Sequence, residues 1–430
     1  MSTAYDLVVV GAGPAGSTAA LVAARSGLTV ALLERGDHPG SKNMFGGVLH
    51  THSLNEIIPR FYEEAPLERA ITRRVINLVT DEASLALDFG HRKLARPPYN
   101  AFSIIRSRFD RWLAGKAQEA GALLLTRTVA QELIRGRSGA YEGVVLQDGT
   151  EIHAPVTICA DGVNSLLAKK AGLRPPLRTD QLALGVKQTL ALPPDVIEDR
   201  CGLQAGEGVD MIYIGSFTRG VGGGAFVYTN SRTLSVGVTL NLADLSRSRL
   251  RPEQVLELFL EEPRIAELVE GAAPREYSAH LIPEGGAHMV PTLAHHGVML
   301  AGDSAGFVLN SGLNLEGANL AITSGRLAAE TAVQAYLDGD LSAQSLGRYR
   351  TALEQSHVLA DLHTFKGAHS FLANNRIYTT YPQTVASFIE EVITVGGTPK
   401  RRLHAIALDH LGKVGWRDAL RDLVASRRYI

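Results

Sequence analysis

The sequence predicts an α/β fold in which one domain has a parallel sheet between helices and a second, α+β domain has a mostly antiparallel sheet. An apolar run, Asp6–Val10, ends in glycines; small residues at helical spacing follow over Pro14–Arg25, and Thr29–Leu33 is apolar again. This succession is typical of a βαβ unit. Strand, glycine turn and long helix return at Gly297–Glu330, whereas alternating, β-branched segments such as Thr233–Leu240 occupy the middle of the chain. The first domain is therefore expected to be discontinuous.

The order of these patterns predicts how the domains share the chain. Four strand-like runs between Leu123 and Ala160 are expected to form a meander that returns to the first domain's sheet, and the pattern beyond Leu341 is helical. The first domain is expected to take residues 1–75, 101–180 and 286–340, the second domain residues 76–100 and 181–285, and a helical C-terminal region residues 341–430.

Composition narrows the classes of function. The 430 residues hold 43 Lys and Arg against 44 Asp and Glu, a net charge of −1, which argues against a nucleic-acid partner. Two cysteines, Cys159 and Cys201, are too few for a four-thiolate iron–sulfur cluster or a disulfide framework. No apolar run is long enough to span a membrane, and the N-terminus reads as folded core rather than an export signal. We expect a cytoplasmic protein.

The first βα turn carries a GxGxxG motif formed by Gly11, Gly13 and Gly16. The first glycine permits a tight turn, the second lets the backbone approach a pyrophosphate, and the third lets helix and strand pack closely. Glu34 ends the next strand, where its carboxylate can accept hydrogen bonds from a ribose diol. A glycine turn without a ligand is the alternative. The candidate dinucleotide-binding residues here are Gly11, Ala12, Gly13, Pro14, Ala15, Gly16, Glu34 and Arg35.

Two further motifs end apolar strands. In VTICADGVNS (Val156–Ser165) the strand ends at Asp161, although an Asp–Gly pair after a strand is often only a turn. In Gly297–Glu330 the strand ends at Gly302 and Asp303, and a glycine-punctuated loop opens a small-residue helix. That Asp can bond a ribityl hydroxyl, and the helix N-terminus would stabilise negative charge on a reduced flavin. The candidates in the third motif are Gly302, Asp303, Leu315, Gly317 and Ala318.

Together the three motifs resemble a flavoprotein group that contains aromatic hydroxylases, geranylgeranyl reductases and electron-transfer-flavoprotein:quinone oxidoreductases. This resemblance implies a Rossmann-like FAD-binding domain of the glutathione-reductase and hydroxylase type. Four more segments resemble, nearly end to end, the FixC family of quinone-oxidoreductase-like subunits from bifurcating FixABCX (EtfABCX) complexes. They are GSKNMFGGVLH (Gly40–His50), YSAHLIPEGG (Tyr277–Gly286), TYPQ (Thr380–Gln383) and GGTPK (Gly396–Lys400).

The resemblance implies FAD as cofactor and an electron-transfer flavoprotein (FixA/FixB-like subunits) as donor. It also implies a membrane quinone as acceptor and a separate ferredoxin-like iron–sulfur subunit (FixX-like). Mitochondrial relatives carry that cluster in a fused C-terminal domain, whereas the two cysteines of this sequence lead us to expect the cluster in another protein. On the same grounds the chain is expected to associate peripherally with the cytoplasmic membrane, and NADH is the expected source of the electrons that the complex splits.

The resemblance also adds site residues. Asn43, Gly46 and Gly47 are expected near the flavin ring, with Lys42 supplying positive charge unless it is a solvated loop lysine. Arg106 resembles the family's arginine that reaches the cofactor, with a surface salt bridge as the alternative. The remaining additions are Val129 for the cofactor and Gly223, Gly224 and His280 for the quinone, with an ordering role on the flavin loop as the alternative for His280. A β-bulge without a ligand would equally explain the two glycines.

No catalytic residue or metal ligand is assigned. The fourteen histidines show no HxxxH or HExxH spacing on a helix with a nearby carboxylate. The basic, partly apolar stretch Lys400–Ile430 suits either an anionic bilayer, a partner, or an ordinary terminal helix. Rival functions are a geranylgeranyl-reductase-like enzyme, an aromatic monooxygenase, and a flavin-bound structural subunit without turnover.

Overall fold

The computed structural model describes residues 5–42, 47–397, 399–427 and 429, in two compact units. Unit 1 consists of Met1–Glu68, Asn100–Leu182 and His280–Lys366, and unit 2 of Arg69–Tyr99, Ala183–Ala279 and Gly367–Ile430. Both units are therefore discontinuous in sequence. The helical stretch predicted over 341–430 is divided between them after Lys366.

Unit 1 is built on a six-stranded sheet with the order β17-β18-β11-β1-β2-β7. Five of these strands run parallel, and only β17 pairs antiparallel, with β18. Strands β1, β2, β11 and β18 are buried throughout, as expected for apolar strands with helices on both faces. The bounds are β1 (Leu7–Val10), β2 (Val30–Leu33), β7 (Leu123–Leu125), β11 (Val156–Cys159), β17 (Ala294–His295) and β18 (Val298–Leu300).

The helices of unit 1 cover this sheet, and two of them approach very closely. A β-carbon at Gly325 would lie 2.1 Å from the carbonyl oxygen of Ala15, so glycine is required where α9 crosses α1. The tyrosine of α11, Tyr349, is fully buried and donates its hydroxyl to the carbonyl of Leu300 over 3.1 Å. The helices are α1 (Pro14–Arg25), α2 (His52–Ile57), α3 (Arg106–Glu119), α4 (Leu166–Lys170), α9 (Ala318–Leu337), α10 (Ala343–Leu346), α11 (Arg348–Gln355) and α12 (His357–Thr364).

Smaller strands complete unit 1. The meander predicted over Leu123–Ala160 is only partly correct: β7 and β11 are parallel members of the main sheet, reached through helix and loop crossovers. Its middle portion forms a separate antiparallel sheet of β8 (Ala130–Arg135), β9 (Tyr141–Leu146) and β10 (Glu151–His153). Two antiparallel pairs remain, β3 (Val48–His50) with β6 (Ala101–Ile104), and β19 (Leu309–Asn310) with β20 (Leu315–Glu316).

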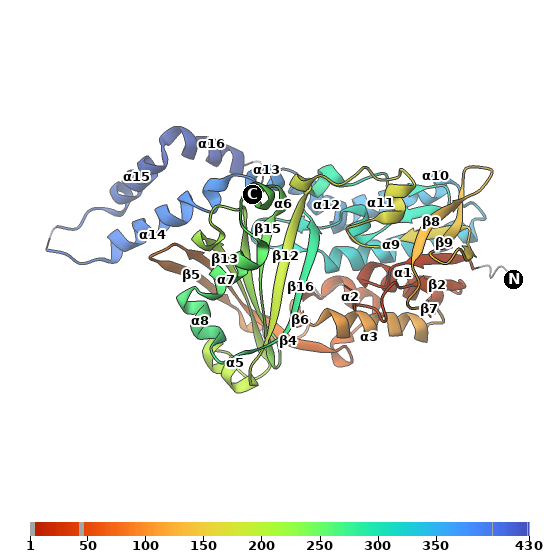
Figure 1. The fold of residues 1–430 in the computed structure, drawn as a ribbon, viewed down its shortest axis with the longest axis horizontal. Helices are drawn as coiled ribbons and strands as arrows, with labels where there is room; N and C mark the ends of the chain where they lie inside the picture. The colour runs from red at the N-terminus through yellow and green to blue at the C-terminus, as the bar shows by residue number, and fades with distance from the viewer. Residues whose placement is uncertain (1–4, 43–46, 398, 428, 430) are drawn as a thin grey trace. The chain divides into compact units, whose positions relative to one another are not determined.

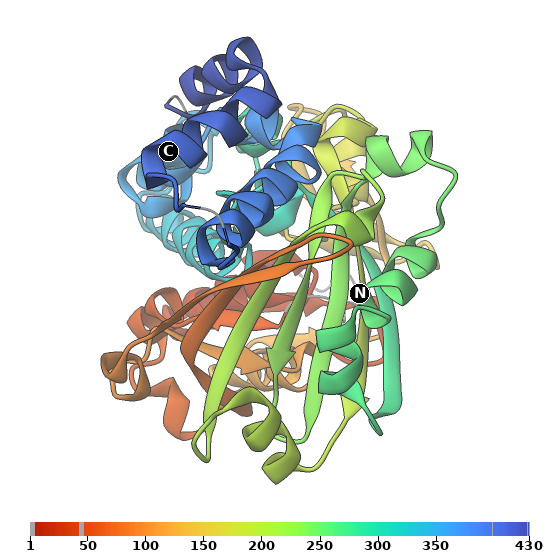
Figure 2. The same cartoon turned by 90° about the vertical axis from the view of Figure 1, so that its left-hand side faces the viewer.

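Unit 2 contains a sheet of mostly antiparallel strands in the order β16-β12-β15-β14-β13-β4, with β5 paired to β4. Its long strands, most of them green, stand side by side in Figure 2. The β13–β4 pair is parallel. Alternate residues such as Val186, Val236 and Val227 face a core shared with α5, α7 and α8. The bounds are β4 (Leu67–Val79), β5 (Ser84–Gly90), β12 (Leu182–Ala191), β13 (Glu207–Gly215), β14 (Gly223–Thr229), β15 (Thr233–Asn241), β16 (Ala273–Pro283), α5 (Pro194–Cys201), α6 (Leu242–Arg247), α7 (Pro252–Leu260) and α8 (Pro263–Val269).

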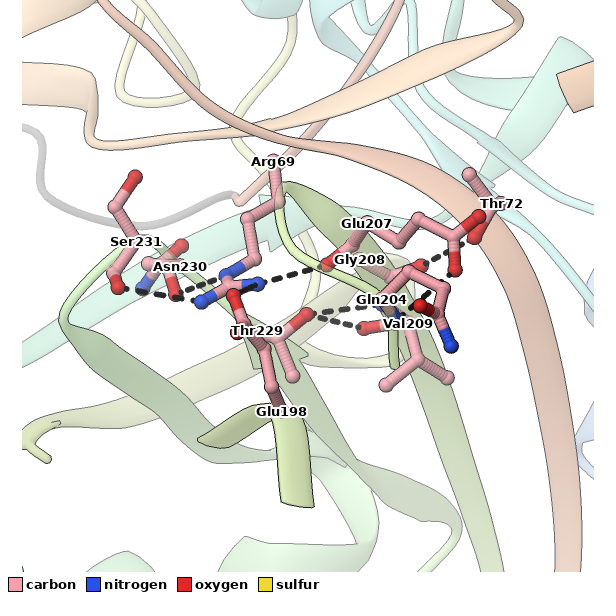
Figure 3. Close-up of polar contacts among 10 residues, drawn as sticks. All are labelled: Arg69, Thr72, Glu198, Gln204, Glu207, Gly208, Val209, Thr229, Asn230 and Ser231. Carbon is pink, nitrogen blue, oxygen red and sulfur yellow. Dashed lines mark hydrogen bonds and ion pairs between the residues drawn. The ribbon is translucent and has the colours of Figure 1, made fainter. Parts of the chain in front are cut away.

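A buried arginine forms hydrogen bonds to several segments at one end of this sheet (Figure 3). Arg69 is 3% exposed; its Nε donates to the carbonyl of Asn230 over 2.8 Å, and its Nη1 donates to the carbonyl of Glu207 over 3.0 Å. Nη1 also forms an ion pair with Glu198 of α5 at 2.8 Å. One guanidinium thus satisfies backbone carbonyls at the start of β13 and in the β14–β15 turn, and holds α5 beside them.

The C-terminal part of unit 2 is helical, as predicted. Helix α14 runs outward, and α15 and α16 return along it (Figure 1). The helices are α13 (Ala368–Leu372), α14 (Thr380–Ile393), α15 (Leu403–Val414) and α16 (Trp416–Ser426). In the described ranges, no helix combines the length and apolar character that crossing a bilayer requires. The predicted α/β class with an antiparallel second sheet and a helical C-terminal region is confirmed.

Candidate flavin-binding site

The three sequence motifs meet at one edge of the unit 1 sheet. Strands β18, β11, β1 and β2 are adjacent and parallel, so their carboxyl ends lie side by side. The ladder continues into the motifs themselves: Gly11 N donates to Leu33 O over 2.8 Å, and Ala160 N donates to Val10 O over 2.8 Å. Segments about 150 residues apart in sequence thereby form one continuous edge, where an α/β sheet binds its ligand.

The three glycines of the first motif differ in their surroundings. Gly11 has φ +99°, and a β-carbon there would lie 2.3 Å from Ala160 O. A β-carbon at Gly16 would lie 1.8 Å from Gly11 O, so this glycine lets α1 pack against the turn. At Gly13, the residue before α1, a β-carbon would meet no atom within 4 Å. The open space beside the helix N-terminus suits a pyrophosphate, whose negative charge the helix dipole favours.

Glu34 is held against this glycine turn. Its Oε2 accepts from Ala12 N over 3.2 Å, its Oε1 accepts from Gly36 N over 2.6 Å, and the residue is 8% exposed. The next residue, Arg35, is exposed. Thr128 N donates to Glu34 O over 2.8 Å, which brings Val129 to the same corner of the sheet. The carboxylate predicted to meet the ribose therefore lies beside the pyrophosphate turn.

Ser304 and Arg174, which the sequence reasoning missed, join the second motif to the third. The Ser304 hydroxyl donates to Asp161 Oδ1 over 2.8 Å. Arg174, 2% exposed, donates from Nη1 to Ser304 O over 2.8 Å and to Asp303 O over 3.1 Å. Burial raises the pKa of Asp161, and the hydrogen bond from Ser304 opposes that rise. The Asp–Gly after β11 is thus part of the site rather than an isolated turn.

Asp303 has two arginines near it and an open carboxylate. Burial raises its pKa, while the positive charges of Arg106 and Arg174 oppose the rise. In the described part of the chain no group donates a hydrogen bond to the Asp303 carboxylate, because Arg174 reaches only its backbone oxygen. Asp303 is itself partly exposed, so a ligand can supply the missing hydrogen bond. This carboxylate is therefore suited to accept one from a ligand hydroxyl.

Arg106 begins α3 and forms a buried ion pair with Asp110, one helical turn later. Nε donates to Oδ1 and Nη2 to Oδ2, each over 2.8 Å. The Arg106 side chain is 10% exposed and the Asp110 side chain 1%, so the surface salt bridge considered from the sequence is in fact an interior pair. Gly40 packs on this turn, since a β-carbon there would lie 2.7 Å from Arg106 O. The pair fixes the cation near Asp303.

Two further titratable groups lie in this unit. Burial, together with the positive charges of Arg106 and Arg35, lowers the pKa of His280 to about 4, so its imidazole is neutral at pH 7. Its Nε2 is buried and has no hydrogen-bond partner among the described residues. Burial raises the pKa of Glu284 to about 7, against a hydrogen bond of 3.1 Å donated by Asn310 Nδ2.

Two helix N-termini converge on this edge. Gly302 has φ +62°, and a β-carbon there would lie 2.9 Å from the β-carbon of Ala15 and 3.5 Å from that of Ala321. The first turn of α1, with Pro14 and Ala15, therefore lies beside the first turn of α9, which follows Gly317 and begins at Ala318. Leu315 lies just before, in β20. Both dipoles present partial positive charge to the same region.

The remaining predicted residues divide into three groups. The first group lies in the loop before β3: Lys42 is exposed, and the carbonyl oxygen of Gly47 accepts a hydrogen bond from Ile104 N over 2.8 Å. The second group, Asn43 and Gly46, lies outside the described residues. In unit 2, β-carbons at Gly223 and Gly224 would lie 2.0 Å from Thr239 O and 2.6 Å from Tyr213 O. Strand packing alone thus accounts for both glycines, and their assignment to a quinone stays a prediction.

These residues fit FAD. A pyrophosphate requires space and hydrogen-bond donors, which the opening at Gly13 and the paired helix N-termini provide. A polyhydroxyl chain requires an acceptor, which the unengaged Asp303 carboxylate provides. In the described ranges, no group of three or more His, Cys, Asp or Glu side chains is placed to hold a metal ion.

Comparison with known proteins agrees with this site. Residues 6–175 match the family described as FAD dependent oxidoreductase, and residues 368–429 match the ETF-QO/FixC family C-terminal domain. The probable electron transfer flavoprotein-quinone oxidoreductase YdiS of Escherichia coli (strain K12) is 40% identical over 419 residues, 97% of each chain. Protein FixC of Salmonella typhi is 40% identical over 418 residues, again 97% of each chain.

Solved structures show the same fold at lower identity. A geranylgeranyl bacteriochlorophyll reductase-like protein from Thermoplasma acidophilum has a TM-score of 0.76 at 21% identity, covering 98% of this chain and 99% of its own. The myxobacterial chondrochloren halogenase CndH, a variant of the FAD-dependent halogenases, has a TM-score of 0.66 at 19% identity, covering 97% of this chain and 99% of its own. These likenesses concern the fold alone. The match of residues 6–175 to the family described as FAD dependent oxidoreductase confirms the predicted cofactor, FAD.

Proposed function

Because the chain belongs to the ETF-QO/FixC family of FAD-dependent oxidoreductases, as its sequence motifs predicted, we propose that it takes electrons from an electron-transfer flavoprotein and passes them to a membrane quinone. The observation that carries the proposal is the similarity over 97% of the chain to a relative whose printed name states this activity. The match at 368–429 to the family's C-terminal domain extends the support beyond the FAD-binding motifs.

Bound FAD supplies the redox chemistry, since its isoalloxazine can take up and release electrons. The chain's own residues hold it. Gly13 and the α1 N-terminus receive the pyrophosphate, Glu34 the ribose, and Asp303 the ribityl hydroxyls. The α9 N-terminus, which begins at Ala318, favours negative charge on the reduced ring. We assign no general acid or base.

Arg106 and Arg174 set the electrostatics of this edge. Both guanidinium groups are buried and act on Asp303, which favours its ionised, hydrogen-bond-accepting form. We propose that His280 exchanges a hydrogen bond with flavin or quinone without adding charge, and its neutral imidazole at pH 7 and its unpartnered, buried Nε2 support this role. Gly223 and Gly224 remain the predicted quinone contacts in unit 2.

Family membership supports a proposal for the electron donor and for the subunits that assemble with this chain. The two cysteines of this sequence, Cys159 and Cys201, are both buried and free, which supports our proposal that a ferredoxin-like subunit supplies the iron–sulfur centre. We propose that FixA/FixB-like subunits deliver the electrons and that this chain forms the high-potential branch of an NADH-oxidising, electron-bifurcating complex. A membrane quinone acceptor also requires the chain to work at a membrane surface, peripherally and from the cytoplasmic side.

Anaerobic stopped-flow mixing tests the donor. The FAD-loaded chain is mixed with a reduced electron-transfer flavoprotein, and bleaching of the chain's flavin absorbance is followed in a single turnover. Rapid reduction that requires this donor supports the proposal. A flavin that this donor does not reduce, in a chain that instead hydroxylates a phenol when NADH and oxygen are supplied, overturns it in favour of the aromatic monooxygenase. Reduction of an isoprenoid double bond would favour the geranylgeranyl-reductase-like alternative.

A further inference from the structure

An acidic side chain, Glu284, lies next to the third cofactor motif in unit 1. It directly follows β16, and the next residue, Gly285, packs on Met289, since a β-carbon at Gly285 would lie 2.9 Å from the β-carbon of Met289. A β-carbon at Gly306 would meet Met289 Cγ, also at 2.9 Å, and Gly306 N donates to Asp303 O over 2.9 Å. Glu284 is therefore connected through Met289 to the turn that contains Asp303.

An asparagine connects the Glu284 carboxylate to the helix that we propose faces the flavin. Asn310 Nδ2 donates to Glu284 Oε1 over 3.1 Å, and Asn310 Oδ1 accepts from Gly312 N over 2.9 Å. The second bond fixes the amide so that its N–H group points at the carboxylate. Asn310 pairs with Leu315 across the β19–β20 hairpin, and Gly317, two residues later, precedes α9. The carboxylate is thus one side chain and one strand pair away from the α9 N-terminus.

The Glu284 carboxylate has no cation to stabilise its charge. In the described part of the chain it forms no ion pair and accepts no second hydrogen bond. Burial raises its pKa to about 7, and the bond from Asn310 opposes that rise. Among the described residues, no charged or titratable group on the surrounding segments adds to these two causes. Those groups are Arg174, Arg178, Asp180, His280, His288, Asp303 and Glu316.

A carboxylate in this environment responds to charge that appears at the cofactor. Reduction of a bound flavin adds negative charge to its ring, and a like charge disfavours the ionised form of a carboxyl group. One unit charge about 12 Å away in a protein interior raises the proton affinity of a carboxylate about tenfold. Glu284 is partly ionised at pH 7, so such a charge decides whether it holds a proton. A glutamine would accept the same bond from Asn310 without titrating.

We propose that Glu284 is a redox-linked proton site, which takes up one proton when the bound FAD is reduced and releases that proton when the FAD is reoxidised. Two electrons and one proton from solvent enter the flavin, and a second proton from solvent converts the Glu284 carboxylate to a carboxyl group. The inference goes beyond the proposed function. It rests on bound FAD alone, because any reductant of the flavin supplies the electrons, and neither the proposed donor nor a quinone is needed.

Potentiometry of the FAD-loaded chain tests this site. Midpoint potentials of wild type, Glu284→Gln and Glu330→Gln are measured with redox mediators between about pH 6 and about pH 9. Wild type and Glu284→Gln should nearly coincide at the lower pH, where the carboxyl group is neutral. At the higher pH wild type should lie about 30 mV lower, which is a tenfold change in affinity for a two-electron couple. The flavin's own proton uptake cancels in this difference. Parallel potentials for wild type and Glu284→Gln would overturn the proposal.

Glu330→Gln is the matched control. Glu330 also lies on α9, but it is exposed and pairs with Arg326 at 3.0 Å, so its potentials should follow those of wild type at every pH. Asn310→Leu, compared with its double variant with Glu284→Gln, tests the geometry. It removes the donor that favours the ionised carboxylate, so the divergence should move to higher pH. An unchanged pH of divergence contradicts the role given to Asn310.

Infrared difference spectra keep the test independent of the variants. At about pH 7.5, reduction of the wild-type chain should produce a band from a protonated carboxyl group, and isotopically labelled glutamate should shift this band. Absence of the band overturns the proposal even where Glu284→Gln does not retain FAD. A chain that shows the band but reduces no quinone would refute the proposed function and leave this proton site standing.

Discussion

The Asp110 carboxylate accepts two parallel hydrogen bonds from the Arg106 guanidinium, and both side chains are buried at the start of α3. Removing one partner of a buried pair leaves the other charge poorly compensated, at about 3–5 kcal/mol. We predict that Asp110→Asn lowers the free energy of unfolding by about this amount and weakens FAD retention, because Arg106 loses the group that fixes it near Asp303. Urea unfolding and flavin release on dilution measure the two effects.

Glu354→Gln is the matched control for this pair. Glu354 also pairs with an arginine one turn away, Arg350 at 2.9 Å, but both side chains are about half exposed. Its loss should change the free energy of unfolding by less than about 1 kcal/mol. Equal effects of Asp110→Asn and Glu354→Gln would show that the buried pair has no special role.

Gly13 and Gly16 should separate flavin binding from folding. Gly13→Ala places a methyl group in open space, so the apoprotein's unfolding midpoint should be unchanged, while FAD affinity falls at least about tenfold because the methyl enters the pyrophosphate region. Gly16→Ala places its methyl 1.8 Å from Gly11 O and should destabilise the apoprotein itself. Fluorescence titration of apoprotein with FAD and thermal unfolding report the two quantities. Unaltered FAD affinity in Gly13→Ala would contradict this location for the pyrophosphate.

The raised pKa of Glu284 should make the free energy of unfolding depend on pH. Its pKa in the folded chain is about 7, above the ordinary value of 4.5, so the unfolded chain releases this proton first as pH rises. Glu284 therefore costs stability progressively between about pH 4.5 and 7, on the order of 3 kcal/mol in full. Glu284→Gln should match wild type at pH 4 and exceed it at pH 8. Parallel stability curves for the two proteins would show that the carboxyl is not held neutral.

Ser304 should contribute to the junction of the second and third motifs. Ser304→Ala removes the 2.8 Å bond to Asp161, which is left with the weaker 3.3 Å bond from Leu167 N. The expected loss of unfolding free energy is about 1–3 kcal/mol. Ser26→Ala is the control, since Ser26 is exposed and bonds only its own helix's Val22 O over 3.0 Å. A loss no larger than that of the control would refute the role given to Ser304.

The cofactor motifs could be predicted because their chemistry is local. Gly11, Gly13 and Gly16 serve one turn between one strand and one helix, so spacing alone reveals them. The same holds for Gly302 and Asp303 before α9. Parallel strands then bring these segments to one edge, which the sequence implied only through the order of its βαβ patterns.

Residues whose role depends on distant neighbours could not be found this way. Arg174 contacts Ser304 across 130 residues of sequence and Ser304 contacts Asp161 across 143, and no periodic pattern records either relationship. Asp110 occurs one turn after Arg106, so the pair could have been noticed, but its burial depends on the tertiary packing of α3. The strands of Leu123–Ala160 are likewise divided between two sheets because they pair with different partner strands. The alternation of apolar and polar residues within one strand does not specify its partner.

Quinol formation under anaerobic conditions tests the central claim most directly. The FAD-loaded chain, a catalytic amount relative to both substrates, is supplied with reduced electron-transfer flavoprotein and a short-chain ubiquinone or menaquinone analogue. We expect one quinol for each pair of electrons delivered, with no product when either the chain or its FAD is omitted. Donor electrons that stay on the flavoprotein, with quinone unreduced while the chain retains its FAD, would contradict it.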